Sequence, residues 1–71
     1  MGIKEIGKAI KSRRMELGIT QTHLSDITRV GINTISIIEQ GEGNPTLEVL
    51  IKILGVLGLQ ISLNPKSDRT I

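Results

Sequence analysis

The side chains of this chain that could do chemistry are amides, hydroxyls and basic groups. The 71 residues contain a single histidine, His23, and no cysteine. A thiolate nucleophile is therefore excluded, and a lone histidine does not make a metal site. We find no nucleophile and base at a spacing that would bring them together. The sequence predicts a protein that is not an enzyme and that has no metal site and no cofactor.

Three polar side chains have the chemistry to contact a nucleic acid. Asn33 is the best candidate for reading a base, because its amide can bond adenine at two atoms. Gln21 opens a short predicted helix, where the side-chain amide and the first N–H groups can both meet a phosphate. Ser36 lies one turn after Asn33 and is as suited to a phosphate as to a base. The alternative for Gln21 and for Asn33 is an ordinary solvated residue.

Two isoleucines lie among these polar residues. Ile32 either contacts a thymine methyl group or is simply exposed. Ile37 is apolar on a face that should be wet, so it either meets a thymine methyl group or packs against another part of the chain. Thr34 and Ile35 are better explained by packing than by base reading. The candidate base contacts are therefore Ile32, Asn33, Ser36 and Ile37.

Basic residues concentrate in the first part of the chain. Residues 1–29 carry six basic and three acidic side chains, whereas residues 30–71 carry three basic and four acidic ones. We expect phosphate contacts from Lys11, Arg13 and Arg29, with a solvated face as the alternative. Asn44, in a Gly- and Pro-rich loop, is a further candidate. The chain has no aromatic residue. Proteins that bind single strands usually stack the bases on aromatic side chains, whereas proteins that bind a duplex do not need them.

Four helices are predicted to position these residues. Apolar residues at helical spacing indicate helices over residues 3–17, 21–28, 32–39 and 47–57. Thr20 and Thr46 are suitable N-caps for the second and fourth helices, and Gly18 and Gly58 are suitable stops for the first and fourth. In the second helix we expect Leu24 and Ile27 to face inward.

The period changes from 3.6 to 2 after Gly58. Apolar residues alternate with polar ones until Pro65, which predicts a short strand made of Leu59, Gln60, Ile61, Ser62 and Leu63. A single strand leaves its backbone groups unpaired, so we expect it to pair with its own copy across a two-fold axis. The predicted domain covers residues 1–64, and residues 65–71 are expected to be a flexible tail.

Several residues in register resemble the Cro/C1-type (XRE) helix-turn-helix family of phage repressors and bacterial regulators. They are the run from Gly18 to Gln21, then Leu24, the run from Thr34 to Ser36, and Ile38, Glu39 and Gly41. The resemblance implies a mostly α, four-helix lambda-repressor-like domain. It also implies a transcriptional repressor whose third helix lies in the major groove of double-stranded DNA.

The resemblance also implies roles for individual residues. It implies that Arg14 and Glu39 form a largely buried ion pair that ties the first helix to the third. Arg29 stands where the family usually has glycine, so it must adopt a left-handed conformation or use a different turn. Ser25 replaces the family's usual small residue after the leucine of the second helix.

A finer resemblance comes from the fourth helix and the predicted strand, which look like those of HipB-type antitoxins. It implies a homodimer held by paired strands, a HipA-type kinase toxin as a partner, and repression of its own operon through a palindromic operator. The alternatives are a phage-type or general repressor without a toxin, and an interaction module that has lost DNA binding. No signal peptide or membrane span is predicted, so a cytoplasmic location is expected.

Overall fold

Four α-helices form the regular structure of residues 1–65, the part of the chain described by the computed structural model. In chain order they are α1 (Ile3–Glu16), α2 (Gln21–Thr28), α3 (Ile32–Glu39) and α4 (Leu47–Leu57). The predicted number and order of helices are confirmed, and each boundary lies within one residue of its predicted place. None of the four helices is long and apolar enough to cross a membrane.

Local capping explains where the helices begin and end. The Thr20 hydroxyl accepts a hydrogen bond from the N–H of His23 at 3.0 Å, and the Thr46 hydroxyl accepts one from Val49 at 3.2 Å. Each bond satisfies a donor that the first turn of a helix leaves free. Gly58 ends α4 in the left-handed region, with φ 71°. The predicted caps are therefore present.

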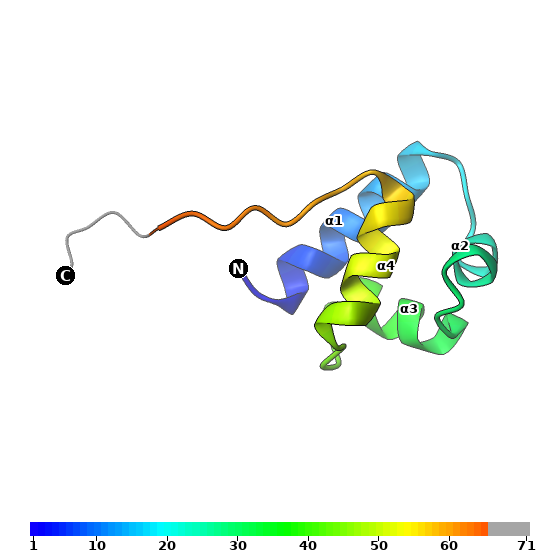
Figure 1. The fold of residues 1–71 in the computed structure, drawn as a ribbon. Helices are drawn as coiled ribbons and strands as arrows, with labels where there is room; N and C mark the ends of the chain where they lie inside the picture. The colour runs from blue at the N-terminus through cyan, green and yellow to red at the C-terminus, as the bar shows by residue number, and fades with distance from the viewer. Residues whose placement is uncertain (66–71) are drawn as a thin grey trace.

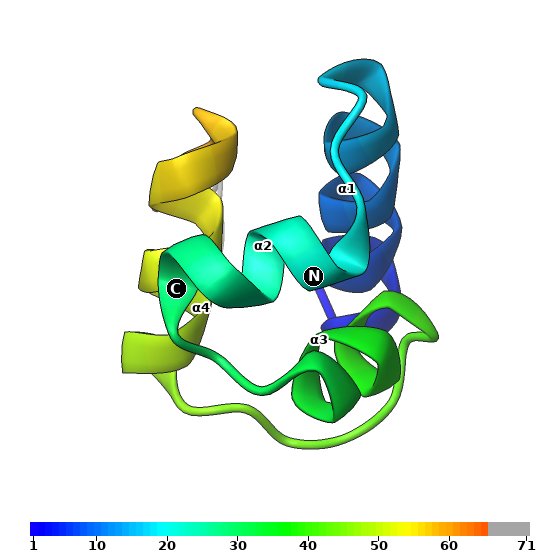
Figure 2. The ribbon, with the colours of Figure 1, turned by 90° about the vertical axis from the view of Figure 1, so that its right-hand side faces the viewer.

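The helices enclose one small apolar core. Helices α1 and α4 are in contact, α2 crosses beside them, and α3 lies at one end of the assembly (Figures 1 and 2). Each helix contributes at least one side chain that is almost completely shielded from water. The fully buried side chains are Ile10, Leu24, Ile35, Ile38, Ile53 and Leu57.

Helices α1 and α3 approach each other closely at Gly7. This glycine is buried, and a Cβ atom placed on it would collide with the backbone oxygen of Ile38. Any larger residue at this position would force the two helices apart. The glycine therefore fixes how near the third helix comes to the first.

The turn between α2 and α3 contains the one strained non-glycine residue among residues 1–65. Arg29 has φ 64° and ψ 19°, the left-handed conformation that the sequence left as one of two options. The Ser25 hydroxyl donates to the oxygen of Val30 at 2.6 Å, and the N–H of Val30 donates to the Thr28 hydroxyl at 3.2 Å. Two side chains of α2 thus hold the turn in place.

The prediction that Ile27 faces inward is wrong. Ile27 is exposed, and Thr28 is buried beside the core instead. Leu24 and Thr28 are four residues apart and so share one side of the helix, whereas Ile27 lies at its flank. The Thr28 hydroxyl can be buried because it donates to the oxygen of Leu24 at 2.7 Å and accepts from Val30.

The predicted strand over residues 59–63 is not formed in the single chain. No strand occurs in the part of the chain that the structure describes, and the segment after α4 runs away from the helices in an extended path (Figure 1). The physical reason is that a strand is defined by ladder hydrogen bonds, which require a second strand. Of the predicted tail, residues 66–71 lie outside the described residues.

The left-handed turn yields a stability prediction. An L-residue in this conformation costs about 1–2 kcal/mol, which glycine avoids, although glycine loses more entropy on folding. We expect Arg29→Gly to raise the free energy of unfolding by about 1 kcal/mol, measured by urea denaturation at one protein concentration. Arg29→Ala is the matched control, because it removes the same charge and keeps the strain. Equal stability of the two variants would contradict this account of the turn.

Candidate nucleic-acid interface

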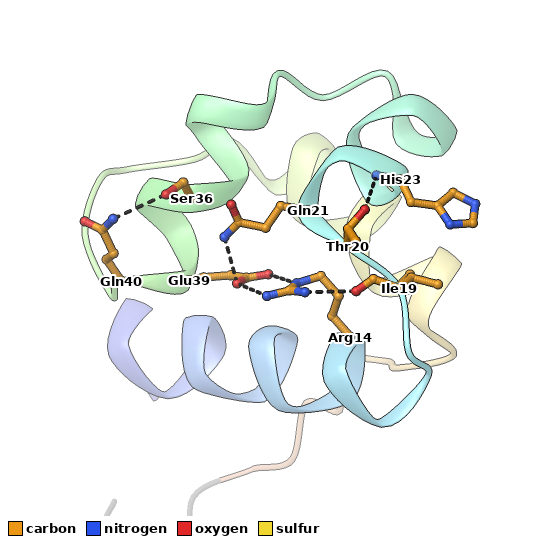
Figure 3. A network of polar contacts seen from close by, with 8 residues as sticks. All are labelled: Arg14, Ile19, Thr20, Gln21, His23, Ser36, Glu39 and Gln40. Atoms are coloured by element: carbon orange, nitrogen blue, oxygen red, sulfur yellow. Dashed lines mark hydrogen bonds and ion pairs between the residues drawn. The ribbon is translucent and has the colours of Figure 1, made fainter.

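A buried cluster around one ion pair joins three helices at the C-terminal end of α3. Arg14, from α1, donates to both carboxylate oxygens of Glu39, on α3, at 2.7 and 2.9 Å. The side chains are only 12% and 2% exposed, respectively. Arg14 also donates to the backbone oxygen of Ile19 at 2.9 Å, and the Gln21 amide, from α2, donates to Glu39 at 3.0 Å (Figure 3). The cluster fixes α3 relative to both preceding helices.

The charges of this pair are stabilised by each other. Burial raises the pKa of Glu39, but the hydrogen bonds from Arg14 and Gln21 and the nearby positive charges outweigh it, so its pKa lies below the ordinary value. The hydrogen bond with Glu39 raises the pKa of Arg14. Both groups are therefore charged in the folded protein at neutral pH. A buried charge without its partner would be costly, so the pair acts as one unit.

The outer face of α3 is turned away from this cluster. Ile35 and Ile38 are buried, while Asn33 is exposed and Ile32 and Ile37 are 41% and 44% exposed. The amide of Asn33 makes no hydrogen bond to another residue of the described chain. Its donors and acceptor are therefore available for an external ligand. Helix α3 thus presents a polar amide flanked by two apolar side chains.

Sequence reasoning missed Gln40 as part of this surface. Gln40 follows the last residue of α3, is exposed, and donates from its side-chain amide to the Ser36 hydroxyl at 3.3 Å (Figure 3). Ser36 is half-buried and does not act alone. The spacings of four residues from Ser36 and seven from Asn33 could have revealed it. Gln40 directly follows the helix predicted over residues 32–39, and it is not among the candidate contacts.

The loop after α3 lies against the same face. A Cβ atom on Gly43 would come within 2.9 Å of the Cγ2 atom of Ile37. Ile37, Asn44 and Thr34 line a shallow hollow between the helix and the loop. Ile37 is therefore partly covered by the loop and partly open, so the packing option holds in part, and contact with a thymine methyl group stays a prediction. Asn44 and Thr34 are exposed beside it, and the expected packing role holds for Ile35 but not for Thr34.

Two of the predicted phosphate contacts have partners within the chain. The Gln21 side chain donates to Glu39 and is half-buried, so only its backbone N–H, in the first turn of α2, stays a candidate for a phosphate contact. The Arg13 guanidinium donates to the oxygen of Leu57 at 2.8 Å and lies 3.5 Å from Glu16. The structure thus places Arg13 at the C-terminal end of α4, and it does not bring Arg13 to α3.

Two other basic candidates are exposed. Lys11 lies on α1 near enough to Glu39 for its charge to help lower the pKa of that carboxyl group. Arg29 lies in the turn between α2 and α3 with no hydrogen bond or ion pair from its side chain to the described residues. Among residues 1–65, no group of three histidine or acidic side chains is placed to hold a metal ion.

The sequence of this chain is similar to that of known proteins over most of its length. A family model described as helix-turn-helix matches residues 10–64. An uncharacterized HTH-type transcriptional regulator of Haemophilus influenzae is 40% identical over 58 residues, which cover 82% of this chain and 59% of that protein. The immunity repressor protein of Bacillus phage phi105 is 33% identical over 57 residues, which cover 80% of this chain and 40% of the repressor.

The similarity extends to archaeal proteins. A putative HTH-type transcriptional regulatory protein of Methanococcus vannielii is 47% identical over 47 residues, which cover 66% of this chain and 14% of the archaeal protein. The chain therefore spans from about one seventh to about three fifths of the length of these relatives. The matched region contains α2 and α3 with the turn between them.

The buried pair predicts how stability depends on pH. Because folding lowers the pKa of Glu39 below its ordinary value of 4.5, its stabilising contribution is complete above that value and is lost as pH falls through the folded-state pKa. We expect Glu39→Gln to lose this part of the acid dependence. At neutral pH it should be less stable by about 3 kcal/mol, because Arg14 is left buried without an anion.

Urea denaturation between pH 3 and pH 7 measures both effects. Glu48→Gln is the control, because it removes an exposed carboxylate of α4 and should cost little. If Glu39→Gln were as stable at neutral pH as Glu48→Gln, the ion pair would not have the structural role assigned to it.

Proposed function

This chain belongs to the helix-turn-helix family, and from that premise we propose that it is a sequence-specific repressor that binds double-stranded DNA. The observation that carries the proposal is the outer face of α3. Asn33 is exposed there with a free amide, and the inner face of the same helix is fixed by the core and the Arg14–Glu39 pair. A rigid helix with an unpartnered amide on its outer side suits the major groove.

Base recognition would use few side chains. Asn33 would bond adenine at two atoms, and Ile32 and the open part of Ile37 would meet thymine methyl groups. Ser36 and Gln40, which are already bonded to each other, would offer further polar groups beside them. This surface is small and partly apolar, so much of the affinity must come from outside it.

Phosphate contacts would surround this reading surface. The N-terminal end of α2 at Gln21, the exposed Lys11 and Arg29, and Asn44 in the loop after α3 are the candidates. Such contacts fix the position of the protein on DNA without reading its sequence. They also make affinity fall steeply with salt concentration. Arg13 remains a weaker candidate, because its guanidinium is bonded to the end of α4.

We further propose that the repressor is a homodimer held by residues 59–63. This segment is extended and has alternating apolar residues, and pairing with its own copy would supply the ladder hydrogen bonds that the single chain lacks. A two-fold dimer would place two α3 helices on half-sites about 34 Å apart in a palindromic operator.

The residue resemblance to HipB-type antitoxins supports a more specific role. In that role the dimer would bind a HipA-type kinase toxin and repress the operon that encodes both proteins. The passage from α4 into an apolar extended segment supports this version, and a kinase gene beside the gene for this chain would support it further. A phage-type repressor without a toxin uses the same DNA interface.

Replacing Asn33 with alanine tests the proposed reading surface. We expect Asn33→Ala to bind its operator at least about fivefold more weakly while its binding to unrelated duplex DNA changes little, because one bidentate amide–adenine contact contributes about 1–3 kcal/mol of discrimination. Electrophoretic mobility shift or fluorescence anisotropy at fixed salt concentration gives both constants.

Asn64→Ala is the matched control, because it removes an exposed amide from the segment after α4. It should leave operator binding unchanged. Unchanged operator binding in Asn33→Ala would contradict the role of Asn33 in base reading. Absence of sequence-selective binding by the wild type would instead favour an interaction module in which Ile32 and Ile37 form a docking face.

A further inference from the structure

An apolar groove lies beside α4, formed by different residues from the proposed DNA-binding surface. One wall is formed by Leu47, Ile51, Leu54 and Gly55 of α4, and the other by Leu59, Gln60, Ile61 and Leu63 of the extended segment. The enclosed volume is about 520 Å³. We call this hollow the α4 groove. No charged side chain lines it, so its occupant must be apolar.

The residues around the α4 groove are unusually open to water. Leu47 is 64% exposed, Ile51 is 57% exposed, and Leu63, on the opposite wall, is 90% exposed. Single exposed apolar residues are common, but a continuous apolar groove on so small a protein indicates a surface that binds something. Six of the nine core side chains are below 2% exposure, so the fold does not lack apolar residues in its interior.

One wall of the groove also offers unpaired backbone groups. The N–H of Leu59 donates to the oxygen of Leu54 at 2.9 Å, which ends the helix. Beyond Leu59, residues 60–65 make no backbone hydrogen bond with any other described residue. A good occupant therefore brings apolar side chains for α4 and backbone donors and acceptors for the extended wall. An extended peptide with alternating apolar residues has both.

Gly55 is unexplained by the fold of the single chain. It lies inside α4, where glycine is unfavourable relative to alanine. A Cβ atom placed on it would meet nothing within 4 Å, so no contact within the described residues requires glycine. Gly55 nevertheless lines the α4 groove. Its bare backbone would let another chain approach the helix more closely than any side chain would allow.

We propose that the α4 groove receives residues 59–63 of a second copy of this chain, with the partner's Ile61 and the partner's Leu63 lying on Ile51 and Gly55. The inference rests on the proposed dimer and adds where each segment is seated. Pairing the two segments places the partner's backbone beside the extended wall, and α4 lies across the groove from that wall. One two-fold contact would then pair both backbones and cover both grooves.

A larger side chain at Gly55 tests whether the partner's segment lies in the α4 groove, and it does so without disturbing the core. We expect Gly55→Leu to keep the helical circular dichroism spectrum and to raise the dimer dissociation constant at least tenfold, measured by sedimentation equilibrium. Val56→Leu is the matched control, because it adds bulk to the next residue of α4, which does not line the groove, and it should dimerise as the wild type does.

The outcomes separate the two proposals. If the wild type dimerises and Gly55→Leu dimerises equally well, the seat in the α4 groove is wrong and the dimer stands. If the wild type is a monomer at every concentration, both the dimer and its seat are wrong.

Disulfide cross-linking tests directly whether residues 59–63 of one chain lie in the α4 groove of another. The chain has no cysteine, so an Ile51→Cys chain can be mixed with a Leu63→Cys chain carrying a mass tag. Under mild oxidation we expect a disulfide between unlike chains in clear excess over a mixture of Lys52→Cys with Leu63→Cys. Equal yields from the two mixtures would overturn the proposal, because Lys52 does not line the groove.

Discussion

The ion pair between Arg14 and Glu39 is the interaction on which the arrangement of helices α1 to α3 depends. Its two charges are almost completely buried, and each is stabilised by the other and by one further partner, Ile19 for the arginine and Gln21 for the carboxylate. Removing either charge would leave the other in a dry site, which proteins tolerate poorly. The cluster joins α1, the start of α2 and the end of α3, so α3 has little freedom to rotate.

That fixed orientation divides α3 into two faces with different tasks. Ile35, Ile38 and Glu39 belong to the interior, and Asn33 and Ile37 lie on the outer side. The left-handed turn and the Gly7 contact set where the helix begins and how near it lies to α1. Recognition by a preformed helix needs little reordering on binding, which lowers the entropic cost of association. The core and the candidate interface are thus two sides of one element.

Most of the fold could be predicted because its signals are local. The 3.6-residue period, the threonine N-caps and the glycines after α1 and α4 gave the four helices, and the family resemblance supplied the Arg14–Glu39 pair. The prediction failed for Ile27 because a helix of two turns presents several apolar arrangements and only packing selects among them. Gln40 was missed because it lies just after the last helical residue. Its helical spacing from Asn33 and Ser36 places it on the outer face, but the Gly- and Pro-rich residues that follow it indicate a loop.

The remaining differences concern partners that a single sequence pattern does not specify. The side chains of Gln21 and Arg13 have acceptors on distant elements, Glu39 and Leu57, and no local spacing predicts such contacts. Residues 59–63 have the pattern of a strand, but a strand needs a ladder, and a ladder is a property of two segments. The alternating pattern therefore indicates that residues 59–63 can form a strand, but the strand forms only when a second segment pairs with it.

The proposed function requires that α3 reads a specific sequence in duplex DNA as one half of a symmetric pair. The most direct measurement is selection of bound duplexes from a randomised pool by the purified chain, followed by sequencing. We expect enrichment of an inverted repeat whose half-sites are about one helical turn apart. A bound pool with no preferred sequence would contradict it.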